Sequence, residues 1–212
     1  PETNSYVIYR ENGGFTPIAT VYGRFTTSYT DVTGSPTTQF ETYTISARDS
    51  CDNIGPFNNA SQHTIYLTVT QINCSDELLL NWNFYDNWTA GVFEYEIWVD
   101  RNFAGSAPVD DVTNTSNSYS LTGINDGDNV CITVQAKRAD GTAVAVSNEV
   151  CLLVNIVQAA DYTVIRNVTV NGPAQIGVEW YPDTNADLEK VSIQRSSDNI
   201  EYANLTTYPI GL

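Results

Sequence analysis

The chain has 212 residues, of which 25 are acidic and 9 are basic, so its formal net charge is −16. Such a surface repels nucleic-acid phosphates and anionic lipids, which need clustered Lys and Arg, and we expect no nucleic-acid partner. The sequence holds no run of about 18 apolar residues, so we expect no direct membrane insertion. Because a leader segment and methionine are also absent, we expect an internal piece of a longer secreted polypeptide.

Short runs of alternating apolar and polar residues, separated by Gly, Asn, Asp and Pro, recur along the chain. Such runs are typical of half-buried antiparallel strands, and no segment keeps a helical period for three turns. The sequence therefore predicts an all-β fold. In the central part we expect strands near residues 77–83, 94–101, 103–109, 117–122, 129–138 and 145–154.

The chain also repeats itself. The stretch Tyr6-Val-Ile8 recurs as Tyr95-Glu-Ile97, 89 residues later, and Leu80-Asn-Trp82 is matched by Val178-Glu-Trp180, 98 residues later. A period of about 90 residues is close to the size of one β-sandwich. An array of like units is usually a spacer or a device for presenting other domains.

The repeat divides the chain into three expected units: a partial sandwich at residues 1–70, a complete one at 71–156 and a partial one at 157–212. A half sandwich leaves strand edges unpaired and its core open. We therefore expect the end units to be completed either by further sequence or by another copy of the chain.

Two of the four cysteines are expected to face each other across a hairpin. If Val130 and Ile132 point into the core, period-two alternation turns Cys131 away from it, and the same counting turns Cys151 to the same face. Both cysteines are equidistant from the turn residue Gly141, so we expect a cross-strand disulfide rather than two free thiols.

Cys51 and Cys74 then pair by elimination, which would tie a loop of the first unit to the base of the second. Two disulfides in a lysine-poor chain indicate an extracellular or cell-surface location. Zinc is not expected, because the cysteines are widely spaced and His63 is the only histidine.

The apolar pattern resembles a known family. Leu80-x-Trp82, Tyr95-x-Ile97, Tyr119-x-Leu121 and Val130-x-Ile132 fall where fibronectin type III domains have their B, C, E and F strands. This resemblance covers the whole chain and implies tandem fibronectin type III-like sandwiches, with strands C to G in the first unit and A to C′ in the last.

A narrower motif, Asp49-Ser-Cys51 followed by His63-Thr-Ile65, resembles the type III repeats of large secreted surface proteins of Bacteroidota. Such repeats commonly precede a sorting domain of the type IX secretion system, of the kind associated with gliding motility. This resemblance implies a bacterial, exported, adhesive protein.

The four tryptophans are expected to differ in role. Trp82 and Trp180 lie in the middle of strands beside apolar residues and are expected in the core. Trp98 alternates with Ile97, so we expect it on the outer face of its sheet, as part of a contact surface or packed on a neighbouring strand. Trp88 follows the strand of Trp82 in a loop, where it either binds a partner or caps the sandwich.

We expect no catalytic residues, no metal and no cofactor. His63 has no recognisable nucleophile or base partner in the sequence. The acidic pairs Asp126/Asp128 and Asp110/Asp111 do not fit the spacing of a calcium loop and are expected to be solvated turns.

The sequence thus predicts a non-catalytic structural or adhesive stalk module of a large exported bacterial protein. Its expected partners are other domains of the same chain, with surface proteins or glycans as further candidates. Two alternatives stay open: a spacer or accessory binding module of a secreted enzyme that acts on polysaccharides, and the ectodomain of a receptor.

Overall fold

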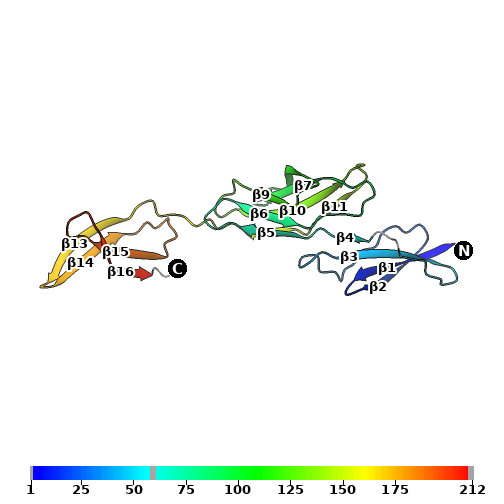
Figure 1. Ribbon diagram of the computed structural model, residues 1–212, viewed down its shortest axis with the longest axis horizontal. Coiled ribbons are helices and arrows are strands. Elements are labelled where there is room, and N and C mark those ends of the chain that lie inside the picture. Colours follow the sequence, from blue (N-terminus) through cyan, green and yellow to red (C-terminus); the bar gives the residue numbers. More distant parts are fainter. Residues whose placement is uncertain (1, 58–60, 210–212) are drawn as a thin grey trace. The chain divides into compact units, whose positions relative to one another are not determined.

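The computed structural model describes residues 2–57 and 61–209, and within these ranges every regular element is a β-strand (Figure 1). The predicted all-β class is therefore confirmed. The chain forms two compact units: residues 1–72 together with 76–155, and residues 73–75 together with 156–212. In the described ranges no helix could cross a membrane.

The first unit begins with a sheet of four strands in the order β2-β1-β3-β4. An Asn12-Gly-Gly14 turn joins β1 to β2, and both glycines have positive φ. All pairings in this sheet are antiparallel. The strands are β1 (Thr3–Glu11), β2 (Phe15–Tyr22), β3 (Thr42–Asp49) and β4 (Gln62–His63).

The two faces of this first sheet are covered differently. Val7 and Tyr9 are buried, and the ring of Phe57 packs edge-on against Tyr9 with ring centroids 4.9 Å apart. On the opposite face, Ile8 and Ile45 line an open cavity of about 280 Å³. This open face carries residues that the repeat aligns with core residues of the complete sandwich, such as Ile8 with Ile97.

A complete sandwich follows in the same unit. One sheet has the order β5-β6-β9, and the other has the order β11-β10-β7-β8, with β12 also paired to β10. This is the strand order of a fibronectin type III-like sandwich. The strands are β5 (Leu67–Gln71), β6 (Leu78–Trp82), β7 (Val92–Arg101), β8 (Ala107–Thr113), β9 (Ser118–Leu121), β10 (Asn129–Arg138), β11 (Val144–Val146) and β12 (Val150–Leu153).

Strict alternation along these strands builds the core of the sandwich. In β10 the burial pattern alternates at every position from Asn129 to Ala136, and β7 alternates in the same way. Trp82 is only 3% exposed and packs on Tyr95, with ring centroids 5.5 Å apart. The fully buried residues of the sandwich include Leu78, Leu80, Tyr95, Ile97, Val130, Ile132, Val134 and Ala136.

Two elements differ from the sequence expectation. Residues 67–70 were expected in the partial sandwich of residues 1–70, but they lie in β5, which pairs with β6 and is the first strand of the complete sandwich. The strand expected at 103–109 starts later, as β8, because the chain turns after β7. Asn102 and Phe103 have φ of 55° and 61° there, and Gly105 has φ of 103°.

Two amide side chains connect the sheets of the sandwich where β5 approaches the last strand. Asn148 accepts a hydrogen bond from the N–H of Leu67 (2.7 Å) and donates one to its carbonyl (3.0 Å). Gln71 forms the equivalent pair with the peptide groups of Asn155, at 2.6 and 3.2 Å. Each amide thus takes the place of a peptide group from a neighbouring strand.

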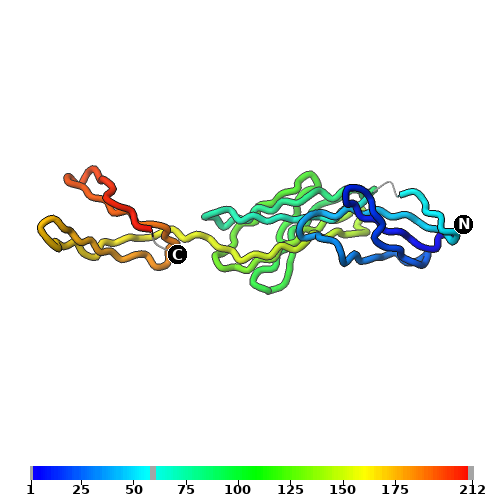
Figure 2. The backbone as a smooth tube through the Cα atoms, turned by 90° about the horizontal axis from the view of Figure 1, so that it is seen from below, coloured from blue at the N-terminus to red at the C-terminus, as the bar shows by residue number. Residues whose placement is uncertain are grey.

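The second unit contains two hairpins. Figure 2 shows β13–β14 as the yellow hairpin and β15–β16 as the orange-to-red one. Apolar residues, among them Ile176, Trp180 and Ile193, line an open cavity of about 670 Å³ in this unit. Trp180, expected in a core, is therefore half-buried at the wall of this cavity. The strands are β13 (Val164–Gly172), β14 (Gln175–Tyr181), β15 (Lys190–Arg195) and β16 (Ala203–Pro209).

Candidate functional site

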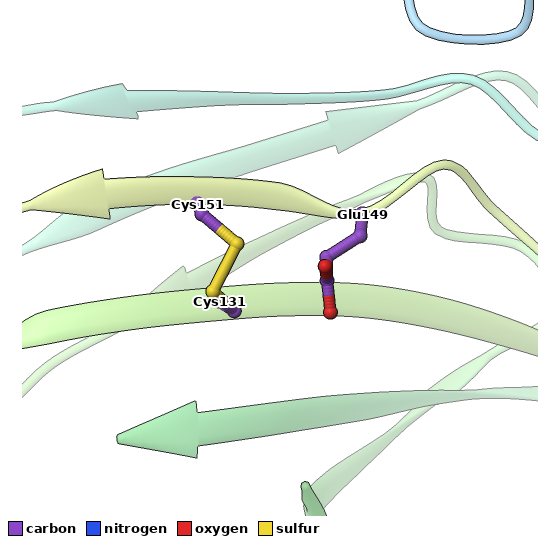
Figure 3. A group of neighbouring side chains, drawn as sticks. All are labelled: Cys131, Glu149 and Cys151. Carbon is purple, nitrogen blue, oxygen red and sulfur yellow. A yellow bond between two sulfur atoms is a disulfide. The ribbon is translucent and has the colours of Figure 1, made fainter. Parts of the chain in front are cut away.

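The disulfide between Cys131 and Cys151 joins β10 to β12 on the outer face of the larger sheet (Figure 3). The two residues lie directly opposite each other in the register, with Cα atoms 4.0 Å apart. The carboxylate of Glu149 lies beside the sulfurs, within 4.8 Å. Because both sulfurs are oxidised, they are not thiolates and do not provide metal ligands in this form.

The expected Cys51–Cys74 disulfide is not formed, and both cysteines are exposed free thiols. The first residue of β3 pairs with His63, and β3 ends at Asp49. The next strand, β5, pairs with β6 and ends at Gln71. Cys51 follows the far end of β3, and Cys74 follows the far end of β5. The two cysteines therefore follow strands of different sheets.

Trp98 lies on the outer face of the sheet and is half-buried. Its indole N–H donates to Glu96 (3.2 Å). Lys137 forms ion pairs with Glu96 and with Glu94 (2.9 Å), and these hydrogen bonds raise its pKa. The ammonium group thus offsets part of the negative charge of a cluster of three carboxylates, of which Asp111 is the third member. A contact role for Trp98 stays a prediction.

The acidic turn that was weighed for calcium forms hydrogen bonds within the protein. Asp128 accepts hydrogen bonds from the side chain of Asn102 (2.8 Å) and from the backbone of Asn125 (2.9 Å), and these bonds lower its pKa. In the other candidate, Asp110 accepts from the N–H of Asp111 (2.8 Å). Asp128 thus shapes a turn, as Asp commonly does. Asp110 and Asp111 were expected in a turn, but they lie within strand β8, where they pair with β7.

A second polar cluster lies on the first sheet, where sequence reasoning named no site. Asp31 accepts hydrogen bonds from Arg10 (2.8 Å), from Thr33 and from Tyr43 (3.0 Å). Burial alone would raise the pKa of Asp31, but the hydrogen bonds and the Arg10 charge outweigh burial, and the net shift is downward. Glu41 is buried beside the same guanidinium group. All of these polar groups have partners within the cluster, which is typical of a structural ion-pair network.

The only histidine of the chain lies at the junction between the first sheet and the sandwich. The Nε2 atom of His63 donates to Asp86 (2.9 Å), since a carboxylate only accepts hydrogen bonds. The Nδ1 atom lies 3.1 Å from both the Asn83 amide nitrogen and the Thr64 carbonyl. Asn83 also accepts a hydrogen bond from the N–H of Tyr66 (2.6 Å).

Aromatic rings extend this junction on both sides of the histidine. The rings of Phe40 and Tyr85 lie 5.6 and 5.7 Å from the His63 ring, and Trp88 lies 4.5 Å from Tyr85. The hydroxyl of the fully buried Tyr95 accepts from the N–H of Tyr85 (2.8 Å), which fixes Tyr85 to the core. Trp88 therefore packs on Tyr85 within the loop, and a contact role for Trp88 stays a prediction.

We call Phe40, His63, Asn83, Tyr85 and Asp86 the junction cluster. His63 lies in β4 of the first sheet, Phe40 lies just before β3, and the other members come from the β6–β7 loop (residues 83–91). Asn87 of the same loop donates to the carbonyl of Ser61 (2.8 Å). Sequence reasoning identified only Trp88 in this loop, although the run of polar and aromatic residues directly after Trp82 was a visible signal.

Comparisons with known proteins add no function. No protein-family model and no curated protein matches the sequence. The FN1–FN3 domains of chicken CNTN1 are similar at 17% identity, over 73% of this chain and 57% of that chain, with a TM-score of 0.37. This chain thus spans under two thirds of that structure.

Two further solved structures are similar at the same level. The chicken interferon gamma receptor alpha chain has 12% identity, over 73% of this chain and 87% of its own, with a TM-score of 0.33. The central fibronectin-III array of RIM-binding protein has 15% identity, over 84% of this chain and 67% of its own, with a TM-score of 0.31. At these values the fold rests on the strand order and register described above, which are those of tandem fibronectin type III-like β-sandwiches.

Proposed function

We propose that this chain is part of a non-catalytic stalk in a large exported protein of the Bacteroidota cell surface. In this role the sandwiches hold other domains of the same polypeptide at a distance from their anchor. The order of units is partial, complete and partial, as the repeat indicates. Surface proteins or glycans are the further partners that we propose for the exposed faces.

The observation that carries this proposal is the connection between the first sheet and the sandwich. β4 ends at His63 and β5 begins at Leu67, so residues 64–66 form the whole linker. Ile65 is 1% exposed, and the N–H of Thr64 donates to the carbonyl of Glu41 (2.9 Å). A short, buried and hydrogen-bonded linker does not behave as a flexible tether.

The polar clusters of the first unit support a structural role. The carboxylates of Asp31 and Asp128, and the imidazole of His63, already have partners within the fold. The net charge of −16 favours solubility and mutual repulsion of neighbouring copies at an exposed surface.

Surface display is tested with an antibody raised against this chain and applied to intact cells of the source organism. We expect binding without permeabilisation and loss of the signal after mild protease treatment. As a control, an antibody to a cytoplasmic protein must bind only after permeabilisation. Binding by both antibodies only in permeabilised cells would contradict the proposal.

The stalk role is tested in the parent protein. We expect that an unrelated pair of rigid β-sandwiches restores the activity of the parent after replacement of this chain, and that a Gly/Ser linker of equal residue number does not. Equal function with the flexible linker would exclude a role that depends on stiffness.

A further inference from the structure

The loops that follow β6 and β14 bind the segments of the chain that precede β5 and β13, respectively. In the first unit, Asn83 of the β6–β7 loop accepts from the N–H of Tyr66, in the linker before β5. In the second unit, the loop between β14 and β15 (residues 182–189) directs two carboxylates at its own entering segment. Asp187 accepts from the N–H of Gln158 (2.8 Å), and Asp183 accepts from the N–H of Asp161 (3.0 Å).

The β6–β7 loop is itself fixed to the sandwich. The N–H of Ala139 donates to the carbonyl of Gly91 (3.0 Å), and Arg138 donates to the hydroxyl of Thr89 (3.1 Å). Tyr85 is fixed through the hydroxyl of the buried Tyr95. The loop therefore transmits the orientation of the sandwich to whatever it contacts.

The junction cluster contacts the first sheet as well as the linker. Asp86 binds His63, which lies in β4, and the side chain of His63 is only 14% exposed. The His63 ring also contacts the rings of Phe40, just before β3, and of Tyr85 in the loop. Asn87 binds the carbonyl of Ser61, just before β4.

We propose that the β6–β7 loop is a joint lock, which fixes the angle between the first sheet and the sandwich through the side chains of the junction cluster. A three-residue linker limits the length of the joint but leaves rotation about its backbone. The imidazole, carboxylate and amide contacts remove that rotation. The inference rests on the proposed stalk role only for its biological use, since the joint is measured on the isolated chain.

The native thiols provide the probe. Cys51 and Cys74 are free and exposed, while Cys131 and Cys151 are bonded to each other. Along the chain, Cys51 follows β3 of the first sheet, and Cys74 lies between β5 and β6 of the sandwich. Spin labels on the two free thiols of the full chain report the distance across the joint by double electron–electron resonance. We expect one narrow distance distribution for the native chain.

Two variants release the lock at separate contacts. His63→Ala removes both the hydrogen bonds and the ring, and Asn87→Gly removes the bond to Ser61 at a position whose φ of 63° suits glycine. We expect both distributions to broaden. Glu11→Ala is the matched surface control, because Glu11 is exposed in β1, and its distribution should stay narrow.

A second readout separates loosening of the joint from unfolding. In the His63→Ala chain, the amide of Tyr66 should exchange with deuterium about fivefold faster, because its partner Asn83 loses the support of the imidazole. The amide of Val134 in the sandwich core should exchange as in the native chain. If both variants keep the core protected and the distance distribution narrow, the joint-lock proposal is overturned.

A wide distribution in the native chain would also overturn the proposal. A native chain with a locked joint that never reaches the cell surface would leave the joint lock intact and refute the proposed function instead.

Discussion

Removing the Asn148 side chain should open the contact between the first and last strands of the sandwich. The amide of Asn148 satisfies both peptide groups of Leu67, a residue 81 positions away and only 1% exposed. In Asn148→Ala, the N–H and the C=O of Leu67 lose their partners together. The cost therefore comes from two backbone groups, in addition to the side chain that is replaced.

The magnitude follows from those two groups. An unsatisfied buried donor or acceptor costs about 1–3 kcal/mol. Asn148 is half-buried, so water can enter the vacated space and recover part of the loss for one of the two groups. We expect the free energy of unfolding of the sandwich to fall by about 2–4 kcal/mol.

The assay is native-state hydrogen exchange of the sandwich core, which reports this sandwich separately from the two hairpins of the second unit. Amides of Val134 and Ile132, which are fully buried, give the global stability of the sandwich. Asn81→Ala is the matched control, because Asn81 lies exposed in β6, and a surface change of this kind should stay within about 0.5 kcal/mol. A change below about 0.5 kcal/mol in Asn148→Ala would refute the reasoning.

Three further predictions concern sulfur and charge. Replacing Cys131 and Cys151 by serine opens a cross-link of sequence separation 20 and should lower the stability of the sandwich by about 3 kcal/mol in urea unfolding, and an unchanged midpoint would contradict this. Alkylation of the unreduced chain should label two thiols by mass spectrometry, Cys51 and Cys74, and an unlabelled chain would show that they are bonded. Folding lowers the pKa of Asp31, so the contribution of its carboxylate to stability is complete above about pH 4 and is lost as the pH falls through the folded pKa. Asp31→Asn should therefore reduce the loss of stability at acid pH, as measured by urea unfolding between pH 2 and 7.

Alternation was sufficient to predict the parts of the fold that depend on one face of a strand. The run from Val130 to Ala136 puts every second residue in the core, and the same counting places Cys131 and Cys151 on the outer face. Such inferences need only the period of a strand and the position of a turn, here at Gly141. Both are local properties that the sequence displays directly.

The two errors at the unit boundary have a different origin. Leu67-Thr-Val-Thr-Gln71 alternates like any half-buried strand, so its pattern does not say whether it pairs with β3 or with β6. The Cys51–Cys74 pairing was inferred by elimination, which assumes that all four cysteines are bonded. Once β5 is assigned to the sandwich, Cys74 lies in the β5–β6 turn, beyond the strand and away from the junction.

The polar contacts could not be predicted for a further reason, since amide side chains carry no period. Asn148 and Leu67 are 81 residues apart, and Gln71 and Asn155 are 84 residues apart. Which of the many asparagines substitutes for a peptide group depends on where two strand edges meet, which only the assembled sheets determine.

The same limit explains why the first sheet (β2-β1-β3-β4) and the larger sheet of the sandwich (β11-β10-β7-β8) differ, although their sequences align. Tyr9 and Trp98 are corresponding residues in the repeat, and both lie on the face of β1 or β7 that points away from the expected core. Tyr9 is buried under Phe57, whereas Trp98 is half-buried beside a charged cluster. The strand pattern sets which way a side chain points. The segment after β3, whose sequence has no regular period, decides whether anything covers that side chain, so units with matching strands present different surfaces to their partners.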